Sequence, residues 1–296
     1  MKTLGRCLTA MVTPFKEDGE VNYAETKRLA KALLKSGNDG LVLAATTGEA
    51  PTLSWDEEMR IFIEVKSAVG DKPTLIAYTG SNSTKEAVEN TEKAEKIGVD
   101  AILSVVPYYN KPNQEGIYQH FKAIAECTSL PVIMYNIPGR VVVEMSWETI
   151  ARLSQFQNIV GVKEASGKME LVAQTISNAS EGFYVWSGND NDTFPIMAMG
   201  GYGVVGVTTH LTGKQYKKMI DLVLAGKIQE AAAIHRKLIP LVNAIFSVPS
   251  PAPIKYALNY LGFKVGKPRL PLVPPTEKEG EKIIAELKRQ TIDLKA

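Results

Sequence analysis

The chain has 296 residues, of which 45% are hydrophobic and 22% charged, so it can bury a sizeable core and does not have the composition of a disordered protein. Its formal net charge of +2 is spread without charged blocks, which indicates no nucleic-acid partner and no membrane surface. There are two cysteines, Cys7 and Cys127. Such low cysteine use argues against a disulfide framework or a zinc site and predicts a cytoplasmic protein, as do an N-terminus without a signal-peptide pattern and the lack of any apolar stretch of transmembrane length.

Short apolar runs rich in β-branched residues recur roughly every 25–30 residues, and an amphipathic helical pattern follows each of them. Eight such strand–helix units in about 225 residues predict a (β/α)8 TIM barrel. A doubly wound open sheet is the alternative, although it would more often have fewer strands. The predicted strands span residues 7–12, 40–44, 74–78, 101–106, 132–135, 159–163, 183–186 and 203–207.

Helix boundaries are also readable. Gly37, Gly70 and Gly98 stand where helices are expected to end. After residue 211 the strand signals stop, and helices are predicted over 214–225, 227–246, 253–261 and 276–289. We therefore expect a catalytic barrel over residues 1–225 and a C-terminal α-helical domain over residues 226–296. The predicted capping boxes pair Ser54 with Glu57, Ser83 with Glu86, and Thr276 with Glu279.

Lys163 ends the sixth predicted strand. In a (β/α)8 barrel, the carboxyl ends of the strands and the loops that follow them form the active face. Burial disfavours the charged ammonium, and a neutral amine is a nucleophile toward a carbonyl carbon. The alternative is a lysine that merely reaches solvent, which is the commoner place for this residue type.

The other strand ends supply several hydroxyls, one guanidinium and backbone amides beside glycine, but no cluster of Asp, Glu and His for a metal ion. This set fits a Schiff-base aldolase that acts on an α-keto acid with neither a metal nor a cofactor, because the protonated imine is itself the electron sink. The strand-end segments are Thr46-Thr47-Gly48-Glu49, Tyr78-Thr79-Gly80, Tyr108-Tyr109-Asn110, Tyr135-Asn136 with Arg140, Lys163-Glu164, Ser187-Gly188-Asn189-Asp190 and Thr208-Thr209-His210.

Four of these segments resemble the motifs of the dihydrodipicolinate synthase family, which belongs to the pyruvate-dependent class I aldolases. The resemblance covers essentially the whole chain, and the motifs occur in the family's order. They are Thr46-Thr47-Gly48-Glu49, Pro107-Tyr108-Tyr109-Asn110-Lys111-Pro112, Tyr135-Asn136-Ile137-Pro138-Gly139-Arg140 and Gly161-Val162-Lys163-Glu164-Ala165-Ser166.

The resemblance implies that Lys163 forms an imine with pyruvate. It implies a proton relay of Thr46, Tyr135 and Tyr109, with Tyr109 supplied by a neighbouring subunit of a homodimer, itself often paired into a tetramer. Arg140 is expected to bind the carboxylate of aspartate semialdehyde. The implied substrate-binding residues are Thr47, Gly48, Arg140, Gly188 and Val205.

The resemblance also implies a place for feedback inhibition. In members that lysine inhibits, the effector binds in a cleft at the dimer interface. Glu86 offers a carboxylate for the amine of lysine, and Trp55 offers an aromatic wall for its aliphatic stem. The alternative is that Trp55 and Glu58 only form the first turn of a helix. The matching residues are Ala50, Pro51, Trp55, Glu58, Asn82, Glu86 and Tyr108.

This chain departs from the family's pattern after Arg140, where Val141-Val142 replaces the usual Thr-Gly. Valine resists positive φ, so we expect this loop to take a different path. Two alternatives to a synthase therefore stay open: a sibling aldolase that cleaves a sialic acid or a 2-keto-3-deoxy sugar acid, and a non-catalytic barrel that senses a keto acid or lysine. Arg140 favours the synthase, and a complete set of lysine, tyrosine and threonine residues argues against a sensor.

Overall fold

The computed structural model describes residues 3–296. Its strands follow one another in sequence order as a closed barrel, so the predicted (β/α)8 topology is confirmed and the open sheet is excluded. The strands are β1 (Cys7–Ala10), β2 (Gly40–Leu43), β3 (Thr74–Tyr78), β4 (Ala101–Val105), β5 (Val132–Asn136), β6 (Ile159–Glu164), β7 (Tyr184–Ser187) and β8 (Gly203–Gly206).

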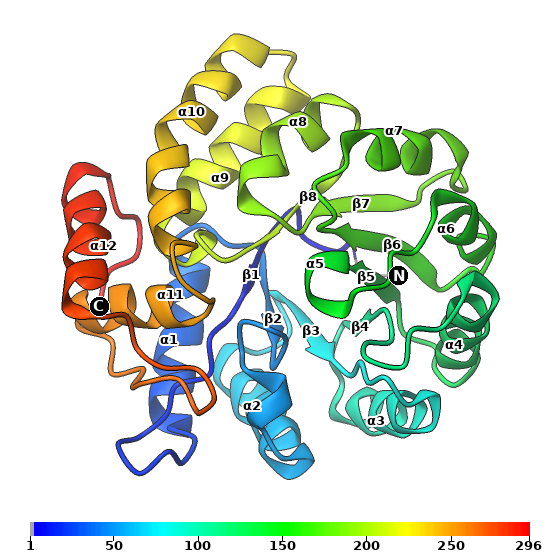
Figure 1. The fold of residues 1–296 in the computed structure, drawn as a ribbon, viewed down its shortest axis with the longest axis horizontal. Coiled ribbons are helices and arrows are strands. Elements are labelled where there is room, and N and C mark those ends of the chain that lie inside the picture. Colours follow the sequence, from blue (N-terminus) through cyan, green and yellow to red (C-terminus); the bar gives the residue numbers. More distant parts are fainter. Residues whose placement is uncertain (1–2) are drawn as a thin grey trace. The chain divides into compact units, whose positions relative to one another are not determined.

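Helices alternate with these strands, and the C-terminal helices lie close to their predicted positions (Figure 1). In the first C-terminal helix, α9, the backbone leaves helical geometry at Thr212 (φ −133°), so the predicted segment 214–225 corresponds to its regular part. The helices are α1 (Tyr23–Lys35), η1 (Ala50–Thr52), α2 (Trp55–Val69), α3 (Thr84–Ile97), α4 (Gln114–Glu126), α5 (Pro138–Val141), α6 (Trp147–Leu153), α7 (Met169–Asn178), η2 (Asp190–Asp192), α8 (Thr193–Ala198), α9 (Thr209–Leu224), α10 (Ile228–Ile245), α11 (Ala252–Tyr260) and α12 (Glu277–Arg289).

Two of the three predicted capping boxes are present. The side chains of Ser54 and Thr276 each accept a hydrogen bond from the backbone N–H of the glutamate three positions on. The carboxylate of that glutamate in turn accepts from the backbone N–H of the capping residue. The third prediction is half wrong. Ser83 does accept from the N–H of Glu86, but the Glu86 carboxylate accepts from the Ser81 hydroxyl at 2.7 Å instead of from the Ser83 backbone. The N–H of Ser83 donates to the Ser81 hydroxyl at 3.1 Å, which removes the need for the glutamate.

One compact unit comprises residues 3–6 and 74–205. Its strands β3 to β7 pair in parallel register, and Figure 1 shows α3, α4, α6 and α7 on the outer side of them. The strands are almost wholly buried, as expected for a parallel sheet covered by helices. The register places Tyr135 of β5 opposite Lys163 of β6, and Lys163 opposite Trp186 of β7.

The second compact unit comprises residues 7–73 and 206–296. In it β1 pairs in parallel with β2, and α9 packs against both β1 and α10. The chain then continues through α10, which contacts α11 and α12 (Figure 1). Buried side-chain hydrogen bonds tie the two segments of this unit together, since the Thr9 hydroxyl contacts both Asn38 Oδ1 at 2.6 Å and Thr209 Oγ1 at 2.8 Å. The helices of the described residues include none that is long and apolar enough to cross a bilayer.

Candidate active site

Lys163 and Tyr135 form the centre of the candidate site. They are directly paired on neighbouring strands, so their side chains leave the same face of the sheet. The Lys163 Nζ lies 4.0 Å from the centroid of the Tyr135 ring, and only 4% of Lys163 is exposed. The structure therefore rejects the alternative of a lysine that reaches solvent, and brings together two of the predicted catalytic residues.

Gly188 follows β7 and lies against the stem of Lys163. A Cβ at this position would lie 3.1 Å from Lys163 Cγ and 2.8 Å from the Cβ of Ala165. The N–H of Gly188 donates to the carbonyl of Glu164 at 2.7 Å, which fixes the close approach. Gly188 thus contributes space beside the lysine, since any side chain there would press on the lysine stem.

The neighbours of the central pair, Asn136 and Glu164, are also paired across β5 and β6 but leave the opposite face. Asn136 Nδ2 donates to Glu164 Oε2 at 2.9 Å, and the N–H of Ser166 donates to Glu164 Oε1 at 2.7 Å. Burial raises the pKa of Glu164, and these two hydrogen bonds oppose the shift. The pair was not predicted as functional. Its visible role is to lock the two strands that carry Tyr135 and Lys163.

Asn136 also anchors the loop that carries Arg140. Its side chain accepts from the N–H of Met145 at 3.0 Å and donates to the Met145 carbonyl at 3.2 Å. Between these anchors, α5 places Arg140 at the surface. Val142 ends the helix with φ 71°, and 67% of it is exposed.

Val142 therefore adopts the positive φ that valine resists, so the premise of the expected different path does not hold at this residue. The N–H of Val142 donates to the Pro138 carbonyl at 2.9 Å, and the far end of the loop is held by Asn136. Backbone strain of this kind persists only where the surroundings over-determine it, and it is commonest at functional sites.

Tyr108 and Tyr109 lie beyond β4, and both are exposed in the single chain. Tyr109 is 90% exposed and has φ 71°, and Lys111 has φ 49°. Asn110 fixes the segment, because its Nδ2 donates to the carbonyl of Asn82 at 2.8 Å. An exposed tyrosine on a fixed loop is compatible with a role in another subunit, which stays a prediction.

The predicted carboxylate-binding residues Thr46, Thr47 and Gly48 form a tight turn after β2, in the second compact unit. The N–H of Glu49 donates to the Thr46 carbonyl at 3.1 Å, and the Thr13 hydroxyl donates to the Gly48 carbonyl at 2.6 Å. Thr47 is buried and Thr46 half-buried. A Cβ on Gly48 would lie 2.9 Å from the Cα of Ala44, so this turn requires glycine.

The residues predicted to bind lysine fall into both units. Ala50 lies in η1, while Trp55 and Glu58 lie in the first turn of α2. Burial raises the pKa of Glu58 to about 9, and the neighbouring Glu57 charge adds to the effect. In the other unit, Asn82 precedes α3 and Glu86 lies in its first turn, where its carboxylate is exposed.

The remaining predicted site residue, Val205, is buried in β8 and is 1% exposed. It carries no polar side-chain group, so it can contribute only apolar surface or backbone. Within residues 3–296, no three His, Cys, Asp or Glu side chains are grouped so that they could hold a metal ion.

Comparison with known proteins gives a consistent result. Residues 3–290 match the model of the dihydrodipicolinate synthetase family. A protein of Dehalococcoides mccartyi named 4-hydroxy-tetrahydrodipicolinate synthase is 60% identical over 294 residues, which are 99% of each chain.

Solved structures agree with this match. The dihydrodipicolinate synthase of Bacillus anthracis superposes with a TM-score of 0.95 at 42% identity, covering 98% of this chain and 99% of that one. The enzyme of Cyanidioschyzon merolae, solved with lysine bound, has a TM-score of 0.95 at 44% identity and covers 96% and 97%.

Proposed function

Because the chain belongs to the dihydrodipicolinate synthetase family, we propose that it condenses pyruvate with L-aspartate-4-semialdehyde through a lysine Schiff base. The product is 4-hydroxy-tetrahydrodipicolinate, an intermediate of lysine and diaminopimelate biosynthesis, and the enzyme is a lyase. The observation that carries the proposal is the buried Lys163 paired with Tyr135 at the end of a barrel strand. The Dehalococcoides mccartyi relative at 60% identity, a 4-hydroxy-tetrahydrodipicolinate synthase by name, supports it.

The chemistry follows from the properties of the imine. The Lys163 amine adds to the ketone carbon of pyruvate and water leaves. The cationic imine withdraws electrons, so the methyl carbon of pyruvate loses a proton and becomes the nucleophile that attacks the aldehyde. The amino group of the semialdehyde then adds to the imine carbon and the Lys163 amine leaves, which closes the ring of the product and frees the enzyme. Tyr135 lies at the lysine and can pass protons, and we assign the rest of the relay to Thr46 and to Tyr109 of another subunit.

Substrate binding is assigned to the residues that the family pattern implies. Thr47 and the amides around Gly48 hold the carboxylate of pyruvate, since backbone donors beside glycine can approach a ligand closely. Arg140 binds the carboxylate of aspartate semialdehyde, because a guanidinium grips a carboxylate with two parallel hydrogen bonds. Gly188 and Val205 line the site without donating a side-chain group.

An assay with alternative substrates tests the reaction. The purified protein is given pyruvate with aspartate semialdehyde, and consumption of both is followed through a coupled reductase. In parallel it is given a sialic acid and a 2-keto-3-deoxy sugar acid, and pyruvate release is followed. We expect turnover of the first mixture alone. Pyruvate release from a sugar acid without condensation would identify a sibling aldolase and overturn the proposal.

We further propose a homodimer, paired into a tetramer, in the cytoplasm. The exposure of Tyr109 supports assembly, because a relay residue that is 90% exposed in one chain has to find its substrate elsewhere. We also keep the proposal that residues 1–225 form the catalytic barrel and residues 226–296 an appended helical domain. Light scattering at assay concentration tests the assembly, and a monomer with full activity would contradict the shared relay.

Inhibition by L-lysine is a second proposal, and the lysine-bound structure of the Cyanidioschyzon merolae enzyme favours it. The residues assigned to this site are Ala50, Trp55, Glu58, Asn82, Glu86 and Tyr108. By linkage, lysine and pyruvate then change each other's affinity by one common factor. Calorimetric titration with L-lysine, with and without pyruvate, tests this. No binding heat and no loss of activity at millimolar lysine would refute the regulation and leave the catalytic proposal intact.

A further inference from the structure

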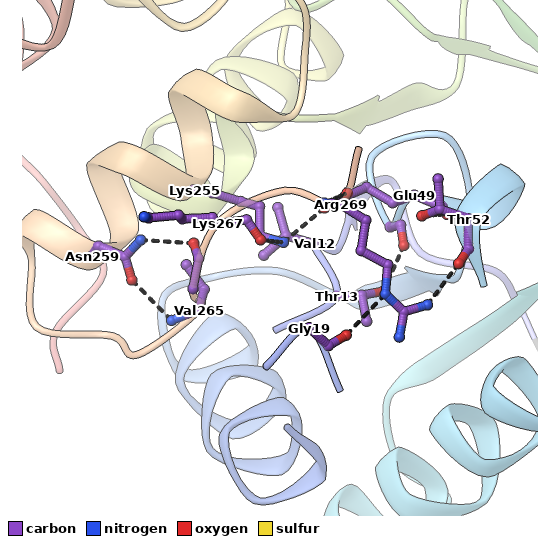
Figure 2. Close-up of polar contacts among 12 residues, drawn as sticks. Val12, Thr13, Gly19, Glu49, Thr52, Lys255, Asn259, Val265, Lys267 and Arg269 are labelled. Atoms are coloured by element: carbon purple, nitrogen blue, oxygen red, sulfur yellow. Dashed lines mark hydrogen bonds and ion pairs between the residues drawn. The ribbon is translucent and has the colours of Figure 1, made fainter. Parts of the chain in front are cut away.

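A buried ion pair connects the C-terminal segment of the chain to the turn after β2. The Lys255 Nζ on α11 donates to Glu49 Oε1 at 2.7 Å, although 206 positions separate the two residues in the sequence. Their side chains are 1% and 2% exposed. Figure 2 shows Lys255 and Arg269 approaching Glu49 from the C-terminal segment.

Both oxygens of the Glu49 carboxylate accept hydrogen bonds from the C-terminal segment. While Lys255 contacts Oε1, the backbone N–H of Arg269 donates to Glu49 Oε2 at 2.8 Å. Lys255 is itself held in place, because it also donates to the Lys267 carbonyl at 3.1 Å and lies 4.1 Å from the centroid of the Phe15 ring. Two fixed donors therefore determine where the Glu49 carboxylate sits.

Arg269 adds a second layer of fixation around the same turn. Its guanidinium donates to the carbonyl of Gly19 at 2.9 Å and to the carbonyl of Thr52 at 2.6 Å (Figure 2). It also donates to both carboxylate oxygens of Glu57. The contact with Thr52 lies at the last residue of η1, and Glu49 is the N-cap of this short helix. The turn is thus held at Glu49 and again three residues later.

The backbone at Glu49 indicates why such fixation is needed. Glu49 has φ 64° and ψ 35°, the left-handed conformation that costs a residue with a Cβ. It directly follows Thr46, Thr47 and Gly48, whose amides are proposed above to bind the carboxylate of pyruvate. Burying a charged pair is expensive, and its removal by apolar residues is often neutral or stabilising, so stability alone is a weak reason for this pair.

We infer that Glu49 and Lys255 are positioning residues for pyruvate, which hold the Thr46–Gly48 turn in the geometry that receives the substrate carboxylate. This inference rests on the proposed function. It assigns to the C-terminal helical segment a part in substrate affinity, although that segment carries none of the residues assigned to the chemistry. Loss of the pair should weaken pyruvate binding and leave the imine chemistry at Lys163 intact.

Steady-state kinetics of Lys255→Met and Glu49→Gln test the inference. We expect the KM for pyruvate to rise about tenfold in Lys255→Met, the change that results when the displaced turn loses the equivalent of one charge-assisted hydrogen bond to the carboxylate of pyruvate. The kcat and the KM for aspartate semialdehyde should stay near their wild-type values. A merely structural pair would lower the folded fraction, and hence the apparent kcat, without changing a Michaelis constant.

Comparison of Glu49→Gln, the double variant and a control variant keeps the test decisive. Glu49→Gln preserves the size of the side chain and an acceptor for the Arg269 N–H, so it should fold even if Lys255→Met does not, and should show a smaller rise in the KM for pyruvate. The double variant Glu49→Gln/Lys255→Met leaves no buried charge unpaired. The factor by which its KM for pyruvate rises should therefore be smaller than the product of the factors for the two single variants. The matched control is Arg289→Met, which breaks an exposed ion pair with Glu286 on α12 and should leave all constants unchanged.

The outcomes separate this inference from the proposed function. A wild-type protein that neither turns over pyruvate nor is trapped by borohydride refutes the function, and the inference with it. A wild-type protein that does both, combined with an unchanged KM for pyruvate in folded Glu49→Gln and a proportional loss of kcat, overturns the inference alone.

Discussion

The neighbouring carboxylates Glu57 and Glu58 on α2 should affect stability in opposite directions, and Glu58→Gln is the sharper test. Burial raises the pKa of Glu58 to about 9 from an ordinary 4.5. The folded state therefore keeps a proton that the unfolded chain loses above pH 4.5. Stability must fall as the pH rises from 4.5 toward 9, because unfolding releases the proton ever more favourably.

The size of the effect follows from the same two values. Each pH unit between them is worth about 1.36 kcal/mol, so the interval from 4.5 to 7 costs the folded protein about 3 kcal/mol at neutral pH. Glutamine has the shape of the protonated acid and never ionises. Glu58→Gln should accordingly be as stable as the wild type near pH 4 and about 3 kcal/mol more stable at pH 7.

Urea unfolding at a series of pH values between 4 and 8.5 measures this difference. Glu57→Gln is the matched control, since hydrogen bonding to Arg269 lowers the pKa of Glu57. The ionised Glu57 carboxylate stabilises the folded state above the pKa of the unfolded chain, and this contribution is lost as the pH falls. Glu57→Gln should therefore be less stable than the wild type at pH 7 and equal to it in acid. A Glu58→Gln difference that does not grow with pH would refute the reasoning.

Three other substitutions test the assembly, the strain and the packing around the site. Tyr109→Phe should lose about 10²-fold in kcat, and mixing it with inactive Lys163→Ala subunits should restore activity in hybrid dimers; hybrids that form but stay inactive would contradict a shared relay. In Val142→Gly the free energy of unfolding, measured by thermal unfolding, should rise by about 1 kcal/mol, because glycine relieves the strain of a φ of 71°. The control Val273→Gly changes an exposed valine without positive φ and should lower the free energy of unfolding. Gly161→Ala should lower the free energy of unfolding by about 3 kcal/mol, since the new Cβ would lie 2.3 Å from a carbonyl oxygen of β7. An unchanged free energy of unfolding would disprove the tight packing of β6 on β7.

The parts of the site that could be predicted from the sequence are those fixed by the period of the strands. Lys163 and Tyr135 end apolar runs, and parallel strands bring such ends to one edge. The prediction of a buried lysine beside a tyrosine therefore needed only the strand assignment and the order of the strands. The choice of Gly188 came from the family resemblance, and its role as free space beside the lysine stem is visible only in the structure.

The contacts that could not be predicted join segments far apart in the chain. Glu49 meets Lys255 and Arg269 across 206 and 220 positions, and no local pattern encodes which polar residues of the C-terminal segment turn inward. The conformation of the loop after Arg140 could not be predicted for a different reason. Valine prefers negative φ, yet Val142 has φ 71° in a loop whose far end Asn136 holds at Met145.

The measurement that tests the central claim most directly is borohydride reduction in the presence of pyruvate, followed by mass analysis of the intact chain and of its peptides. An imine at Lys163 predicts that each chain gains the mass of one reduced pyruvate, located on the peptide that contains Lys163. The same treatment should leave Lys163→Arg unmodified, because a guanidinium stays protonated and is not a nucleophile. No adduct in the wild type, or an adduct on another lysine, would contradict the account.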